Sequence, residues 1–254
     1  MLVLNYQHLI KHLIILEECF FFQLPPDNNL RLLEDLSDYR VGDQVEGATF
    51  EESGLALEEL AKLHGTFWGE VNSDEFDWMP RFSNSWNATN MLEGSQASWE
   101  QAAQNFDEHM PQWIRDIKED YFQALPELQK HLDKEPVTVL HGDFRLDNLF
   151  FGKEPHHHKM TFIDWQGPVR GRGPVEIAFL LAQSTKIEER RAHEKELIQR
   201  YLDSLQAQGV SEYSFDEAWE DFRVSNKLTT DEMLELCSFS KGTVEAIEQT
   251  AQKM

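Results

Sequence analysis

The sequence predicts an α+β protein that is mainly helical and carries a few short strands near its middle. Three short apolar runs, at Val137–Leu140, Leu149–Phe151 and Met160–Ile163, are bounded by glycine and polar residues. Runs of this length and setting are typical of buried strands. Much of the remaining chain has helical spacing of its apolar residues, and two helices begin at capping boxes. A hydrophobic content of 41% over 254 residues is enough for a globular core.

The composition is strongly acidic, with a formal charge of −23. This charge argues against nucleic acid and against an anionic membrane surface as partners, because both are negative. It would attract a cationic small molecule, although most acidic surfaces serve solubility. The two cysteines, Cys19 and Cys237, form no disulfide framework and predict a reducing, cytoplasmic compartment. No spanning helix or signal peptide is expected, and the oligomeric state is not predicted.

The first part of the chain combines a helical pattern with two strand-like runs. Residues 2–16 have the pattern of the end of a helix, and Cys19–Leu24 and Leu30–Leu33 that of two short strands. The prolines, aspartate and asparagines of Pro25–Asn29 predict a turn between them.

A capping box at Thr49–Glu52 predicts a helix whose apolar face contains His64, which we expect to be a packed core residue. Residues 72–94 are expected to form a loop with short helices. Further helices are predicted after it: two within 97–132, bent or broken near Pro111 or Pro126, then 174–183, 187–205 and one from a capping box at Ser214–Glu217.

Three oxygen-bearing side chains lie at the tips of the predicted central strands. They are Asp143, Asn148 and Asp164. Two carboxylates and an amide suit a hard cation such as Mg²⁺, which usually binds together with substrate phosphates. An Asp followed five positions later by an Asn, with a second Asp on a following hairpin strand, is the spacing of phosphoryl-transfer enzymes.

These residues resemble the aminoglycoside phosphotransferase and choline-kinase-like family, whose members are distant relatives of protein kinases. The family's His-Gly-Asp-x-x-x-x-Asn stands at His141–Asn148, and its Ile-Asp-Trp at Ile163–Trp165. The resemblance covers about 30–224. It implies a protein-kinase-like fold: a remnant of the N-terminal β lobe and the hinge in residues 1–36, then a mainly α-helical C-terminal lobe with short catalytic β-hairpins in residues 37–254.

The resemblance also implies an ATP- and Mg²⁺-dependent O-phosphotransferase that acts on a hydroxyl of a small molecule. Asp143 would be the general base, and Asn148 and Asp164 would hold Mg²⁺. Arg145 would either stabilise the transferred phosphate or form a salt bridge to Asp147.

Three further residues are implied for nucleotide binding. Glu34 and Leu36 lie in the segment that resembles the hinge beside adenine, and Phe150 lies where the family has an apolar floor under the base. No glycine-rich turn precedes Cys19, and no strand before it carries the phosphate-pairing lysine of kinase-like small lobes. The alternative function is therefore a catalytically impaired kinase-like fragment that acts as a binding or interaction protein.

Four other features leave alternatives. Trp78, Trp86 and Trp99 either line an acceptor pocket or pack the lobe. Gln166–Gly173 is expected to be an irregular loop whose Arg170 or Arg172 either contacts phosphate or acceptor or keeps the loop soluble. Glu176 lies at or beside the position where the family has an Asp bonded to the catalytic loop. The histidines 156–158 are interpreted as a solvated turn, because adjacent residues rarely converge on one metal ion.

Overall fold

The computed structural model describes residues 35–105, 110, 112–116 and 118–229. The predicted helix and strands of residues 2–33 lie outside this part. The strands are β1 (Arg40–Val41), β2 (Thr138–Leu140), β3 (Leu149–Phe151), β4 (Met160–Phe162) and β5 (Val169–Gly171). The α-helices are α1 (Phe50–Thr66), α2 (Trp86–Asn105), α3 (Gln112–Asp116), α4 (Lys118–His131), α5 (Pro174–Gln183), α6 (Ile187–Ala207) and α7 (Phe215–Thr229). Single 3-10 turns are η1 (Asp74–Phe76), η2 (Phe82–Asn84) and η3 (Leu146–Asn148). The α+β class is confirmed.

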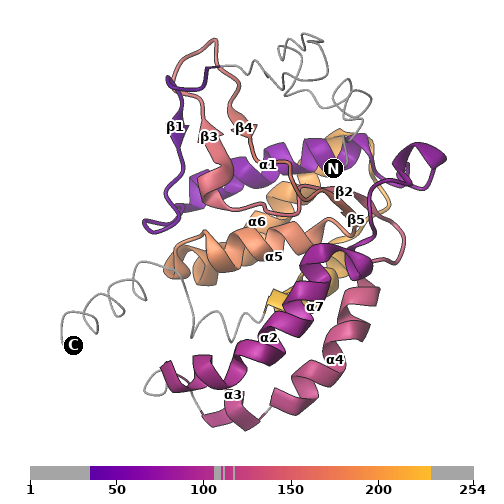
Figure 1. The fold of residues 1–254 in the computed structure, drawn as a ribbon. Coiled ribbons are helices and arrows are strands. Elements are labelled where there is room, and N and C mark those ends of the chain that lie inside the picture. The colour runs from indigo at the N-terminus through magenta and orange to yellow at the C-terminus, as the bar shows by residue number, and fades with distance from the viewer. Residues whose placement is uncertain (1–34, 106–109, 111, 117, 230–254) are drawn as a thin grey trace, which may run out of the picture.

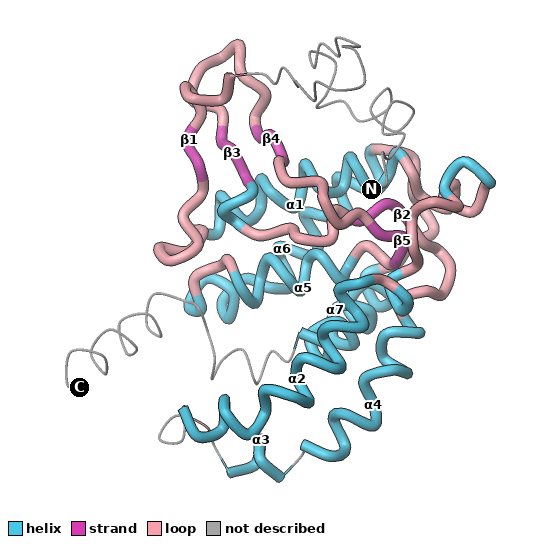
Figure 2. The backbone as a smooth tube through the Cα atoms, viewed as in Figure 1, coloured by secondary structure: helices cyan, strands magenta, loops and turns pink. Residues whose placement is uncertain are grey.

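The strands form two small antiparallel sheets. One sheet has the order β1-β3-β4, and the other pairs β2 with β5. In the hairpin of β3 and β4, Leu149 lies opposite Phe162 and Phe151 opposite Met160, and all four are buried. Phe150 points to the other face, as the alternation of a strand requires, and is only half-buried. Figure 2 shows this sheet at one end of the molecule and the helices α2, α3 and α4 at the other.

The main core contains buried residues of β3 and β4 and of the helices α1, α5, α6 and α7, which lie beside the three-stranded sheet (Figure 1). Helix α1 begins at its predicted capping box: the Thr49 hydroxyl accepts the N–H of Glu52, and the Glu52 carboxylate accepts the N–H of Thr49. Its buried Leu57 and Leu60 belong to the same core cluster as Leu197 and other apolar residues of α6. Among the described residues, no helix is long and apolar enough to cross a membrane.

One helix prediction was wrong in detail, because α2 begins at Trp86, inside the segment predicted as a loop with short helices. Of the two positions predicted for a bend or break, Pro126 lies within α4. Proline removes one helical hydrogen bond, but Phe122 and Leu125 on the same helix are buried, and this packing outweighs the local cost. The interruption between α2 and α4 lies around α3, close to the other predicted position, Pro111, which is outside the described residues.

The irregular loop predicted for Gln166–Gly173 is wrong in its second half, where β5 pairs with β2. Val169 is buried in a cluster with Phe82 and Leu140. Gly171 permits this close packing, because a Cβ there would lie 2.9 Å from Cδ1 of Leu140 and 3.3 Å from Cβ of Phe82. Long-range packing, which a short glycine-rich sequence does not reveal, makes this segment a strand.

Candidate active site

The predicted catalytic loop leaves β2 at His141, whose side chain is fully buried. Its Nε2 lies 2.8 Å from the carbonyl oxygen of Ile163, and its ring packs against Trp165 with centroids 4.5 Å apart. The next residue, Gly142, has φ 85°, a conformation that is costly for residues with a Cβ. His141 therefore joins the loop to the segment that carries Asp164, and Gly142 makes the turn toward Asp143.

A buried carboxylate on helix α5 holds this turn. Glu176 Oε1 accepts the N–H of Gly142 at 2.8 Å, and Oε2 accepts the N–H of His141 at 3.0 Å. The Nε2 atom of His64 lies 3.1 Å from Oε2. Glu176 therefore makes the contact with the catalytic loop that the resemblance associates with an Asp, and His64 is confirmed as a packed residue of the core.

The Nε2 atom of His64 faces Glu176, and because a carboxylate oxygen accepts hydrogen bonds, Nε2 is the donor in this contact. On the other side of the ring, the hydroxyl of Tyr201 lies 2.8 Å from Nδ1. Burial raises the pKa of the Tyr201 hydroxyl well above its usual value, so this hydroxyl keeps its proton.

The predicted base and one predicted metal ligand are in direct contact. Asn148 Nδ2 donates to the backbone oxygen of Asp143 at 2.9 Å and to its Oδ2 at 3.1 Å. Arg145 lies between two carboxylates: its Nε is 3.3 Å from Oδ2 of Asp143, and its Nη1 is 3.4 Å from Oδ2 of Asp147.

Asp164 lies two residues after the end of β4 and is the one described non-glycine residue with positive φ, at 65°. The N–H of Ile163 donates to the backbone oxygen of Asn148 at 3.0 Å, so the hairpin brings the chain at Asn148 beside the chain that leads into Asp164. Gln166 Nε2 donates to Oδ2 of Asp164 at 3.4 Å. Asn148 and Asp164 thus leave the same end of the β3–β4 hairpin.

The chemistry of this donor set fits a hard cation, since it offers carboxylate and amide oxygens. Within the described residues, no group of three His, Cys, Asp or Glu side chains could hold a metal ion. A site here would thus depend on the amide of Asn148, as the sequence pattern predicts.

The residues implied for the adenine site are described only in part. Phe150 lies half-buried on β3, and Leu36 lies partly exposed just before β1, where its carbonyl accepts the N–H of Tyr39 at 2.9 Å. Glu34 lies outside the described residues. Their role in nucleotide binding stays a prediction.

The two arginines of the predicted loop turn inward. Arg172 is buried, with its Nε 2.5 Å from Oδ2 of Asp221, and it donates to the carbonyls of Lys134 and Glu135. Arg170 donates to the carbonyl of Val71 at 3.1 Å. Both arginines therefore make contacts within the protein that link distant segments. These contacts correspond neither to a phosphate or acceptor contact nor to a role in loop solubility.

The remaining alternatives are resolved by packing where the structure describes the side chains. Trp99 is buried against Phe122, and Trp78 packs against the main core. The side chain of Trp86 is outside the described part. The three histidines lie in the turn between β3 and β4, where His157 stacks on Tyr39 with centroids 4.3 Å apart.

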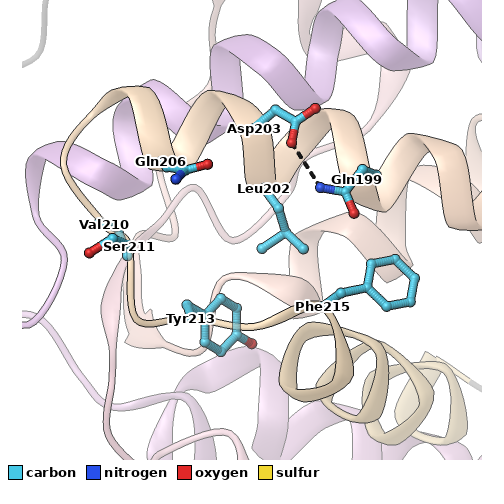
Figure 3. A pocket seen from close by; sticks show the side chains of 8 residues that line it. All are labelled: Gln199, Leu202, Asp203, Gln206, Val210, Ser211, Tyr213 and Phe215. Carbon is cyan, nitrogen blue, oxygen red and sulfur yellow. Dashed lines mark hydrogen bonds between the residues drawn. The ribbon is translucent and has the colours of Figure 1, made fainter.

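A pocket lies elsewhere, between the end of α6 and the segment that leads into α7 (Figure 3). Its polar lining includes Gln199 and Asp203, whose side chains are joined by a hydrogen bond of 2.8 Å. Tyr213, also in the lining, bonds to Asp221. None of the predicted site residues lines this pocket, so it is separate from the candidate active site.

Two residues of the loop's surroundings were missed from the sequence: Gln44, in a turn between β1 and α1, and Ser184, at the end of α5. Both bond to the N–H of Leu146. No motif marks them, because each is an isolated polar residue whose partner is more than 30 positions away.

The fold and the loop define the class of this protein as protein-kinase-like, with a helical lobe and a His-Gly-Asp loop beside an Asp-bearing hairpin. The model of the ecdysteroid kinase-like family matches residues 8–210, and the chain belongs to that family. The kinase-like family relationship inferred from residues 141–165 is thereby confirmed.

Several solved structures are similar. An aminoglycoside-3'-phosphotransferase of type VIII is 20% identical, with a TM-score of 0.42, over 75% of this chain and 66% of that one. A macrolide 2'-phosphotransferase type I is 11% identical, with a TM-score of 0.39, over 81% of this chain and 62% of that one. The choline kinase LicA from Streptococcus pneumoniae is 11% identical, with a TM-score of 0.40, over 90% and 82%. The chain thus spans less than two thirds of the length of the first two. No curated protein sequence matches it.

Proposed function

We propose that the protein is an ATP- and Mg²⁺-dependent O-phosphotransferase acting on a hydroxyl of a small molecule. The observation that carries this proposal is the hydrogen bond of 3.1 Å from Asn148 Nδ2 to Oδ2 of Asp143, beside the hairpin that ends at Asp164. These are the residue types that act as base and metal ligands in phosphoryl transfer. Membership of a kinase-like family supports the same reaction class.

Asp143 is the proposed base. Its side chain is 38% exposed, so an acceptor hydroxyl can reach it. Oδ2 already accepts hydrogen bonds from Asn148 and Arg145, which fixes the orientation of the carboxylate and leaves Oδ1 for the acceptor. A carboxylate held within hydrogen-bond reach of a hydroxyl can orient it and take its proton during transfer.

Asn148 and Asp164 are the proposed metal ligands, the first through its amide oxygen and the second through its carboxylate. When bound with ATP, Mg²⁺ would supply positive charge that neutralises the negative charge developing on the phosphoryl group during transfer. We propose that Phe150, Leu36 and Glu34 receive the adenine end of the nucleotide. Phe150 supports this, because its ring lies on the sheet face opposite the buried core.

Arg145 is proposed to stabilise the transferred phosphoryl group. Its side chain is 42% exposed, and its contacts with Asp143 and Asp147 are long, at 3.3 and 3.4 Å. Exposed pairs of this kind contribute little to stability, so the guanidinium can turn toward a phosphate at small cost. The salt bridge and the phosphate contact are then two positions of one side chain.

Calorimetry and turnover together test the proposal. The wild type is expected to bind Mg-ATP with a Kd between about 1 μM and 1 mM, the range usual for enzyme substrates. Asp143→Asn should keep this binding and lose transfer by about 100-fold or more. Asp164→Asn should lose the Mg²⁺-dependent part of nucleotide binding. Asp74→Asn, at an exposed position of η1, is the matched control.

The acceptor is best sought with compounds that differ in charge and ring type. An ecdysteroid, choline and an aminoglycoside represent the family description and two of the similar structures. Transfer from γ-labelled ATP to one of them would support the proposal. No heat with Mg-ATP up to about 1 mM would contradict it and would favour a binding protein without catalysis.

A further inference from the structure

We propose that Gln44 is a positioning residue that holds the second half of the catalytic loop, Arg145–Asn148. The effect of Gln44 on Mg²⁺ binding rests on the proposed phosphotransferase function. The hydrogen bonds by which Gln44 holds the loop do not depend on that function. Gln44 lies in the turn that follows β1, about 100 positions before the loop that it contacts.

One glutamine side chain joins three separate segments. Its Oε1 accepts the N–H of Leu146 at 3.0 Å and the hydroxyl of Ser184 at 2.9 Å. Its Nε2 donates to the carbonyl of Gln183, at the end of α5. The N–H of Leu146 also donates to Oγ of Ser184, at 3.1 Å. The amide thus satisfies a backbone donor of η3 and a terminal carbonyl of α5, two groups that would otherwise lose hydrogen bonds.

The backbone of Gln44 makes a further contact. Its N–H donates to Oδ1 of Asp147 at 2.9 Å. The other oxygen of Asp147 faces Arg145, which in turn faces Asp143. Gln44 is therefore linked to Asp143 through two consecutive side-chain pairs, Asp147–Arg145 and Arg145–Asp143. It is linked to Asn148 through η3, the turn that contains both Leu146 and Asn148.

The turn that presents Gln44 is itself closely held. Asp43 Oδ1 accepts the N–H groups of Val45 and Glu46, both at 2.9 Å. Gly42 donates to the carbonyl of Leu149 at 2.9 Å, and a Cβ at position 42 would lie 2.3 Å from the backbone oxygen of Leu146. Such close approach of two backbones fixes the distance from which the Gln44 side chain reaches the loop.

The loop is consequently held at two points by different elements. Glu176 binds the N–H groups of residues 141 and 142, and Gln44 with Ser184 binds that of residue 146. Asp143 lies between these two points along the chain. Arg145 and Asn148 lie beside the second point, the N–H of Leu146. Loss of Gln44 should therefore affect the proposed metal ligand Asn148 more than the first turn of the loop.

The test compares Gln44→Ala and Ser184→Ala with Val45→Ala, which truncates an exposed neighbour on the same turn. Hydrogen exchange is measured on the full chain without nucleotide. Exchange at the Leu146 amide should be faster in Gln44→Ala than in the wild type, and fastest in the double variant Gln44→Ala/Ser184→Ala. Exchange at His141 and Gly142 should be unchanged. Isothermal titration of Mg²⁺ into the ATP-saturated protein should show an affinity about 10-fold or more weaker in Gln44→Ala, the size of effect known for groups that orient metal ligands.

Unchanged exchange at Leu146 in both Gln44→Ala and the double variant would overturn the inference. Faster exchange with unchanged Mg²⁺ affinity would overturn the positioning role and leave only a structural contact. If the wild type binds no Mg-ATP at all, the proposed function fails, whereas the exchange experiment still decides whether Gln44 holds the loop.

Discussion

Glu176 accepts the N–H of Gly142 at 2.8 Å, and this bond ties helix α5 to the turn before Asp143. Gly142 has a left-handed backbone, so the direction of its N–H depends on that conformation. The buried carboxylate and the turn therefore support each other. The position of Asp143 depends on a residue that is 34 positions away from Gly142 in sequence.

The first prediction concerns this carboxylate. Glu176→Ala should lower the free energy of unfolding by about 3 kcal/mol or more, because the N–H groups of His141 and Gly142 and the Nε2 donor of His64 lose their acceptor. Glu176→Gln keeps one oxygen and should lose less. Urea denaturation measures both, with Glu188→Gln at an exposed position of α6 as the control. Equal stability of Glu176→Ala and the control would show that the buried bonds are not needed.

The second prediction concerns Gly173, beside the pair of His64 and Tyr201. A Cβ at this position would lie 2.4 Å from the Tyr201 hydroxyl oxygen and 2.7 Å from His64 Nδ1. Gly173→Ala should therefore destabilise the protein by about 1–3 kcal/mol, the usual cost of overpacking.

Tyr201→Phe removes the nearer of those atoms, so the double variant should lose less stability than the two single losses added together. Gly94→Ala is the control: it lies in α2 with open space around it, and it should be neutral or stabilise by up to about 1 kcal/mol. Additive losses in the thermal unfolding of the three variants would contradict the clash.

The third prediction concerns alkaline pH. Burial raises the pKa of Tyr121 to about 12, so the unfolded chain loses this proton near pH 10 while the folded protein keeps it. The contribution of Tyr121 to stability is complete below pH 10 and declines as the pH rises toward 12.

Tyr121→Phe should make the stability fall less steeply between about pH 10 and 12 than in the wild type. Below about pH 9 the two proteins should show parallel pH dependence, which serves as the internal control. Denaturant melts at each pH give the slopes, and identical slopes above pH 10 would contradict the prediction.

The fourth prediction compares a buried ion pair with an exposed one. Asp221 is 3% exposed and contacts Arg172, His131 and Tyr213. Asp221→Ala leaves the buried guanidinium of Arg172 without its carboxylate and should cost about 3–5 kcal/mol. Glu220→Ala removes the partner of Arg223 in an exposed pair on the same helix and should cost at most about 1 kcal/mol. Similar losses in both variants would show that burial does not decide the cost.

The parts of the fold that the sequence predicted are those with strong local signals. Helix α5 spans the predicted residues 174–183, and α6 ends two residues after its predicted limit, before Gly209 with φ 97°. The capping boxes at Thr49 and Ser214 both form. In each case the signal lies within a few residues of the element that it predicts.

The parts that were missed depend on distant partners. β5 is a strand because Val169 and Gly171 fit against β2, and Arg172 is buried because Asp221 meets it from α7. For the site, the motif located Asp143, Asn148 and Asp164, and the structure brings the first two into contact. Gln44 and Ser184 carry no local signal, since the partner that they share, the amide of Leu146, lies more than 30 positions from each of them.

The backbone at Asp164 has a consequence for how variants of this residue are interpreted. At φ 65°, glycine, asparagine and aspartate are accommodated more easily than alanine, and a β-branched residue is strained. An alanine substitution therefore changes main-chain energy and removes a carboxylate at the same time. Comparing the asparagine and glycine replacements separates the two effects, because both residues accommodate this backbone conformation while the carboxylate is removed.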